Sequence, residues 1–131
     1  MLKQYKMFVD GVTSEASKDT KIFIQSIERL QEQGCNIARL DTAFTGLCSE
    51  SGEANDLVKK LKFHGKEWTP EIREHLIREL GDVIWYWAQA CLALDIDPED
   101  VLIANVKKLE ARYPGGKFSI EKSENRVAND I

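Results

Sequence analysis

The sequence has few cysteines, and their arrangement argues against whole classes of protein. Cys35, Cys48 and Cys91 are odd in number, lie far apart and include no CxxC pair. Such a pattern is not that of a disulfide-stapled scaffold or of the usual cysteine-based zinc site. We therefore expect three reduced cysteines in the core of an intracellular protein.

Long apolar runs and an excess of positive charge are absent as well. No uninterrupted apolar stretch approaches the ~18 residues that a membrane span needs, and the N-terminal segment carries Lys3 and Lys6. The formal net charge is −4, so the overall field offers no electrostatic footprint for duplex nucleic acid or anionic lipid. The sequence therefore predicts a cytoplasmic protein whose partners include neither a nucleic acid nor a membrane.

Strand-like alternation of polar and apolar residues is also missing, and nearly every stretch has the period of a helix. We predict an all-α chain, a helical bundle of about five helices over residues 2–12, 19–33, 36–63, 69–94 and 97–113. A length of 131 residues, 43% of them hydrophobic, is enough for one domain with one core. Residues 1–131 are thus expected to form a single domain with a loosely held polar tail from about residue 117.

Residues with known positional preferences mark the ends of these helices. Gly34 is suited to end the second helix, and Thr69 is a good N-cap for the fourth, with Pro70 at its first position. Asp97 followed by Pro98 repeats this chemistry at the fifth helix. The apolar residues that recur along the fourth helix are Leu76, Leu80, Val83, Ile84, Trp87, Cys91 and Leu94. We expect this spine to face the core.

Two pairs of acidic residues stand out, because the members of each pair lie three residues apart on a predicted helix. Glu50 and Glu53 belong to the third helix, and Glu79 and Asp82 belong to the fourth. Like charges at this spacing repel, and helices normally relieve them with Lys or Arg one turn away. Only Asp82 has such a neighbour, Arg78. Glu50 falls within the apolar sector of its helix, Glu53 on the border of that sector, and Glu79 just outside the spine.

Burying such acids together requires raised pKa values or a shared cation. Two antiparallel helices that present two carboxylates each form an all-oxygen site, which suits Mg²⁺, or Mn²⁺, rather than zinc. We therefore expect a metal site between the third and fourth helices. The candidate ligands are Glu50, Glu53, Glu79 and Asp82. The simpler alternative is that all four are solvated surface charges.

A di-iron site is a further kind of carboxylate centre found inside helical bundles. It needs Glu-x-x-His pairs, in which a glutamate precedes each histidine by three residues. His64 and His75 are preceded at that distance by Leu61 and Ile72. The di-iron alternative therefore fails on ligand type.

Three parts of the sequence closely resemble the MazG-like nucleotide pyrophosphohydrolases. They are residues 46–53 (GLCSESGE) with Lys59-Lys60, residues 79–86 (ELGDVIWY), and the later residues Asn105, Lys108-Leu109 and Arg112-Tyr113-Pro114. The resemblance covers about residues 40–118, and the family pattern is ExxE followed after a short interval by ExxD. Some members carry another glutamate directly before the first pair, where this chain has Ser49. That departure leaves open which carboxylate activates water.

The resemblance implies hydrolysis of a (deoxy)nucleoside triphosphate between the α- and β-phosphates, which yields a monophosphate and pyrophosphate. Carboxylate-held Mg²⁺ would neutralise triphosphate oxygens, orient the scissile group and lower the pKa of the attacking water. We expect Glu53 to be the base and the other three acids to be mainly ligands. The candidate phosphate-binding residues are Lys60, Asn105, Lys108 and Arg112, and the family uses the matching Asn and Lys. The implied role is removal of excess or noncanonical nucleotides.

Two other functions remain open, and self-assembly is a further expectation. Phosphoribosyl-ATP pyrophosphohydrolases share the fold and the metal chemistry, whereas a non-catalytic helical interaction module would not depend on Mg²⁺. Several apolar residues lie off the predicted spine or on the short first helix: Ile77, Trp85, Ala88, Leu92, Tyr5, Phe8 and Val12. One small bundle cannot easily cover them all. We therefore predict a homodimer or a homotetramer, in which symmetric contacts bury the same surface on each copy.

Overall fold

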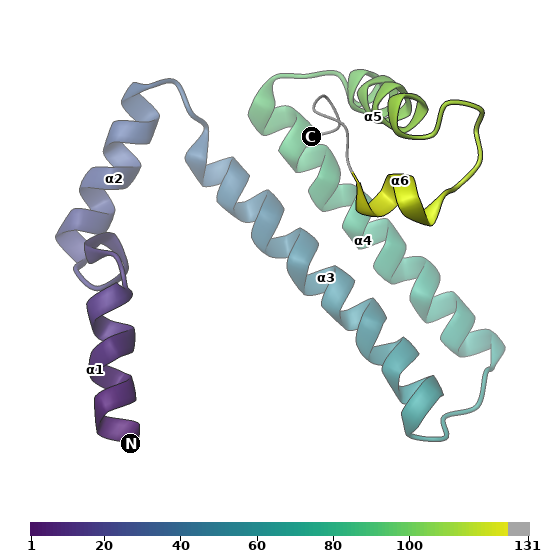
Figure 1. Cartoon of the computed structure of the whole chain (residues 1–131), viewed down its shortest axis with the longest axis horizontal. Helices are drawn as coiled ribbons and strands as arrows, with labels where there is room; N and C mark the ends of the chain where they lie inside the picture. The colour runs from purple at the N-terminus through teal and green to yellow at the C-terminus, as the bar shows by residue number, and fades with distance from the viewer. Residues whose placement is uncertain (126–131) are drawn as a thin grey trace.

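The computed structural model describes residues 1–125 of the chain, and this part is helical throughout its regular structure (Figure 1). The elements are α1 (Leu2–Val12), the 3₁₀ turn η1 (Glu15–Ser17), α2 (Thr20–Glu32), α3 (Ile37–Phe63), α4 (Pro70–Leu94), α5 (Pro98–Arg112) and α6 (Ile120–Glu124). No strand occurs within residues 1–125, so the all-α prediction is confirmed. The short α6 lies within the segment predicted as a polar tail, and residues 126–131 of that tail fall outside the described residues.

The helix ends follow the capping chemistry of the sequence. The Thr69 hydroxyl accepts a hydrogen bond from the backbone N–H of Ile72 at 3.4 Å, and Pro70 begins α4. The Asp97 carboxylate accepts from the backbone N–H of Glu99 at 2.8 Å at the start of α5. Gly34 follows α2 with a φ of 83°, a conformation that favours glycine. These signals place the five long helices close to their predicted ranges.

α3 and α4 form a long antiparallel hairpin, which is the main packing contact within the described residues (Figure 1). The buried residues of this contact are Ala43, Gly46 and Leu57 on α3, and Ile72, Glu79, Ala90 and Cys91 on α4. Along α4, positions 72, 76, 79, 83, 86 and 90 are all buried or half-buried, and they alternate in steps of four and three. This is the repeat expected for two helices packed at a small angle.

The predicted spine of α4 is wrong in part, because the contact with α3 follows a different stripe. Leu80 and Ile84 are 61% and 59% exposed, and Leu94 is also exposed. Glu79, which sequence reasoning put just outside the spine, lies inside the contact. Small residues explain the difference, since Ala43 and Ala90 are buried in the seam and let the two helix backbones approach closely. Close approach of the backbones outweighed the greater hydrophobicity of the Leu80 stripe.

Gly46 is a point of tight contact between the two helices. A Cβ atom placed there would overlap the ring of Tyr86, so the ring lies directly against the glycine backbone. Trp85 meets the same ring edge-on, with 4.8 Å between ring centroids and an interplanar angle of 89°. The Gly46–Tyr86 contact therefore helps to hold α3 and α4 in one register.

Outside the hairpin the described chain is open. α1 and α2 form an arm on one side of Figure 1, and α5 and α6 lie on the other. The accessible surface is 10757 Å², whereas a compact monomer of 14.9 kDa exposes roughly 7,000 Å². Large apolar side chains such as Phe8, Phe23 and Phe44 are exposed. A single copy thus leaves roughly 3,700 Å² more surface uncovered than a compact domain of its mass.

The three cysteines differ in exposure. Cys91 is buried and Cys35 half-buried, but Cys48 is exposed, so the expectation that all three belong to the core is wrong for Cys48. All three are free thiols. Within residues 1–125, every helix is too short or too polar to cross a membrane.

Candidate metal centre

A cluster of carboxylates occupies the middle of the α3–α4 hairpin. One oxygen each from Glu50, Glu53 and Glu79 can be chosen so that the three atoms lie within 4.8 Å of one another. Asp82 is close enough to influence the ionisation of Glu50. The expected position of a carboxylate cluster between the third and fourth helices is therefore confirmed.

The four acids differ in exposure according to their place on each helix. Glu79 lies in the seam and is only 6% exposed, whereas Glu50 is half-buried beside it. Glu53 and Asp82 are exposed. A residue three positions away on a helix is turned by about 60°, which carries Glu53 and Asp82 out of the seam to the solvent side. Glu79 therefore lies at the buried side of the cluster, and Glu53 and Asp82 form its solvent-exposed rim.

Burial and like charge act together on Glu50. Burial is the main cause that raises the pKa of the Glu50 carboxyl above its usual range, and the charges of Glu53, Asp82 and Glu79 raise it further. A hydrogen bond with Glu79 adds to the rise. The mutual repulsion of these carboxylates is therefore a cost that a bound cation would relieve.

The donor set fits a hard divalent cation. Within residues 1–125, no lysine or arginine forms an ion pair with Glu50, Glu53 or Glu79. Their ligand atoms are all carboxylate oxygens, which suit Mg²⁺ or Mn²⁺ better than zinc or copper. A divalent ion would neutralise the repulsion among these carboxylates. Glu50, Glu53, Glu79 and Asp82 are the residues that could hold it.

His75 is a neighbour of the cluster that sequence reasoning did not identify as part of the site. Its Nε2 atom lies 2.9 Å from Oε1 of Glu79, one helical turn further along α4. The available signal was the four-residue spacing, which brings side chains together on a helix. His75 is thus the one described residue other than an acid that contacts Glu79 through a charged or polar side-chain group.

A cavity of about 340 Å³ opens beside the cluster. It is lined by Ser49, Gly52, Glu53, Asp56, Leu57, Lys60, His75 and Glu79. Asp56 pairs with both Lys59 and Lys60, and hydrogen bonds from these two lysines lower the pKa of Asp56 to about 2. Lys60 is therefore held at the wall of the cavity that Glu53 and Glu79 share.

The other predicted phosphate-binding residues lie on α5. Asn105 is exposed, and Lys108 and Arg112 are half-buried, with the Arg112 guanidinium 6.0 Å from the centre of the Tyr113 ring. Within the described residues, α5 does not pack extensively against α3 or α4. A single copy therefore brings Lys60 to the carboxylates but does not pack the α5 residues against them.

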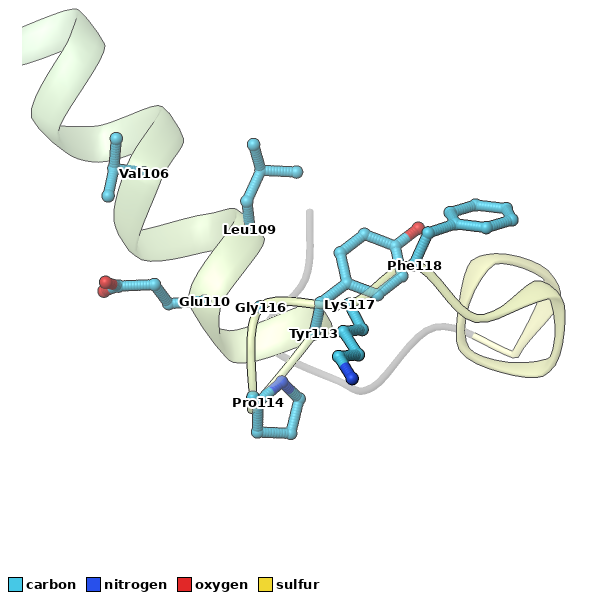
Figure 2. Close-up of a pocket in the computed structure, with 9 residues that line it drawn as sticks. Val106, Leu109, Glu110, Tyr113, Pro114, Gly116, Lys117 and Phe118 are labelled. Carbon is cyan, nitrogen blue, oxygen red and sulfur yellow. The ribbon is translucent and has the colours of Figure 1, made fainter.

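A second, more apolar hollow lies at the end of α5 and shares no residue with the carboxylate cavity. Figure 2 shows the side chains around it, with Val106 and Leu109 on α5. Tyr113 stands at the end of this helix, beside Phe118, which follows the turn. The two rings are 5.8 Å apart between centroids. Gly115 and Gly116 have φ values of 109° and 69°, which let the chain turn back here.

Comparison with known proteins adds an independent observation. Residues 39–117 match the family model described as the MazG nucleotide pyrophosphohydrolase domain. This segment contains the four carboxylates, Lys60 and the three α5 residues. A curated relative, "Gene 37 protein" of Mycobacterium phage L5, is 39% identical over 82 residues, which are 62% of this chain and 72% of that protein. No solved structure matches the chain.

Proposed function

Because the chain belongs to the MazG nucleotide pyrophosphohydrolase domain family, we propose that it hydrolyses (deoxy)nucleoside triphosphates between the α- and β-phosphates. The products are the monophosphate and pyrophosphate, and Mg²⁺ is the proposed cofactor, with Mn²⁺ as a substitute. One observation carries the proposal: in the matched segment, ligand oxygens of three carboxylates from α3 and α4 lie within 4.8 Å of one another, and within residues 1–125 none of the three pairs with a lysine or arginine.

The four acids divide their roles according to exposure. Glu50, Glu79 and Asp82 hold the ion, with Glu79 anchored in the seam. When bound, the ion neutralises phosphate charge and makes a nearby water more acidic. Glu53 lies on the exposed rim, where water has access, and accepts the proton that water loses as its oxygen bonds to phosphorus. Pyrophosphate is the leaving group.

Cations outside the cluster bind the remaining phosphate charge. Lys60 is the best supported of these, because it lines the cavity together with Glu53 and is held there by Asp56. We propose that Asn105, Lys108 and Arg112 bind phosphate as well. For these three, α5 has to approach the cavity, either by closing over its own hairpin or from another copy of the chain.

Self-assembly is part of the proposal. The roughly 3,700 Å² of extra exposed surface per chain exceeds what a standard protein–protein contact buries. A homodimer or homotetramer would cover the exposed apolar residues of α4 and of the α1–α2 arm. Such an arrangement also offers a route for α5 of one copy to reach the cavity of another.

The proposed role is removal of excess or noncanonical nucleotides in the cytoplasm. The test is incubation of the purified protein with a panel of nucleoside triphosphates, noncanonical nucleotides and phosphoribosyl-ATP, each with Mg²⁺. Pyrophosphate and orthophosphate are measured separately. We expect pyrophosphate from nucleoside triphosphates, a loss of at least ~100-fold in Glu53→Gln and no loss in Glu28→Gln, an exposed control on α2. Orthophosphate alone, turnover of phosphoribosyl-ATP alone, or no turnover of any compound would refute the proposal.

A further inference from the structure

His75 contacts the carboxylate cluster without being one of its acids. It lies one turn before Glu79 on α4, and its Nε2 atom is 2.9 Å from the Glu79 Oε1 atom. At this distance the Nε2–H of His75 donates a hydrogen bond to the carboxylate oxygen, which accepts it. His75 is 54% exposed and borders the cavity, whereas Glu79 is buried.

Glu79 needs a donor more than the other acids do. It is the one buried charged residue within the described part of the chain, and its position in the seam removes most of its contact with water. The other groups around its carboxylate are the acids Glu50 and Glu53. Within the described residues, His75 is therefore the one non-acidic residue whose polar side-chain group contacts the Glu79 carboxylate.

A carboxylate has two oxygens with about four acceptor positions, so one oxygen can accept from His75 while the other faces the cation. Hydrogen-bond partners of metal-ligating carboxylates fix ligand orientation, and their loss commonly costs 10–100-fold in metal affinity. We propose that His75 is a positioning residue that holds the Glu79 carboxylate in its metal-binding orientation. This inference rests on the proposed function, since it assigns Glu79 as a metal ligand.

The test measures metal affinity directly, without nucleotide. Free Mn²⁺ is followed by electron paramagnetic resonance during titration of the full-length protein at about pH 8, above the usual titration range of imidazole. His75→Leu removes the donor, and His75→Gln keeps an N–H donor at similar reach. His64→Leu is the matched control, because His64 caps α3 and lies about 16 Å along the helix axis from Glu53.

We expect His75→Leu to weaken Mn²⁺ binding 10–100-fold, while His75→Gln and His64→Leu stay within about threefold of the unchanged protein. In turnover assays, His75→Leu should need more Mg²⁺ for half-maximal rate while its melting temperature in EDTA stays close to that of the unchanged protein. Equal Mn²⁺ affinity in His75→Leu, or a failure of His75→Gln to restore it, overturns the inference. So does an unchanged protein that binds no Mn²⁺. If that protein binds Mn²⁺ but releases no pyrophosphate, the proposed function fails while the role of His75 is still decided by the titration.

Discussion

The exposed stripe of α4 makes assembly a measurable prediction. Leu80 and Ile84 lie outside the α3–α4 seam and are 61% and 59% exposed, so replacing both with glutamate leaves the hairpin contact intact. Full burial of a Leu or Ile side chain is worth about 1.5–3 kcal/mol, so covering the exposed part of each yields about 1–2 kcal/mol. In a symmetric contact each substitution is made twice. Loss of one side chain in both copies therefore costs about 2–4 kcal/mol, or roughly 30–700-fold in the dissociation constant, and the double substitution costs more than either change alone.

The assay is multi-angle light scattering across a range of concentrations, combined with circular dichroism. We expect the unchanged protein to have at least twice the 14.9 kDa mass of one chain at low micromolar concentration. The Leu80→Glu, Ile84→Glu variant should shift to the single-chain mass, keep its helical spectrum at high concentration and lose turnover. Lys107→Glu, an exposed change on α5, serves as the control. An unchanged protein of 14.9 kDa with full activity, or a double variant that stays assembled, would refute the reasoning.

Four further predictions concern the site and the hairpin. Saturating Mg²⁺ should raise the melting temperature by roughly 5–15 °C and Glu50→Gln should reduce that gain, so identical melting curves in EDTA and Mg²⁺ would contradict a metal site. Lys108→Ala should lower turnover far more than the free energy of unfolding, and full turnover would return Lys108 to an ordinary surface role. Gly46→Ala should cost about 1–3 kcal/mol in urea unfolding, because its methyl group meets the Tyr86 ring; an unchanged midpoint would show that the ring moves freely. The lowered pKa of Asp56 means that its ion pairs stabilise the fold above about pH 4 and lose this effect as the pH falls toward 2. Asp56→Asn should therefore reduce the dependence of the free energy of unfolding on pH in this range, measured in EDTA. An unchanged pH dependence would argue against a stabilising role of these ion pairs.

The helices could be predicted because their ends depend on local chemistry. Thr69 and Asp97 accept hydrogen bonds from backbone N–H groups within three residues, and such contacts require no knowledge of the rest of the fold. The carboxylate cluster was predictable for a similar reason. Two acidic pairs in which only Asp82 has a cation one turn away are unfavourable on isolated helices, so the sequence alone indicates that something else neutralises them.

The register of the hairpin could not be predicted, since it depends on contacts between segments far apart in the chain. The apolar stripe through Leu80 and Ile84 is a better core candidate by hydrophobicity than the stripe through Glu79. The seam nevertheless follows Glu79, because Gly46 and Ala90 allow close packing there. The separation of α5 from the hairpin was also beyond the sequence, as helical period says which face is apolar and not what covers it.

Because the carboxylates of the cluster come from both helices, their relative positions depend on the axial register of α3 and α4. Glu50 lies on α3 and Glu79 on α4, with ligand oxygens close together. A shift of one helix along the other by one turn, about 5.4 Å, would separate these two carboxylates. The helices are joined only by residues 64–69, so the length of that connection is coupled to the ion. Insertions or deletions in this loop, which contains none of the four acids, are expected to change the affinity for a cation. The length of this loop therefore belongs, with the four acids, to what would set the geometry of the proposed metal site.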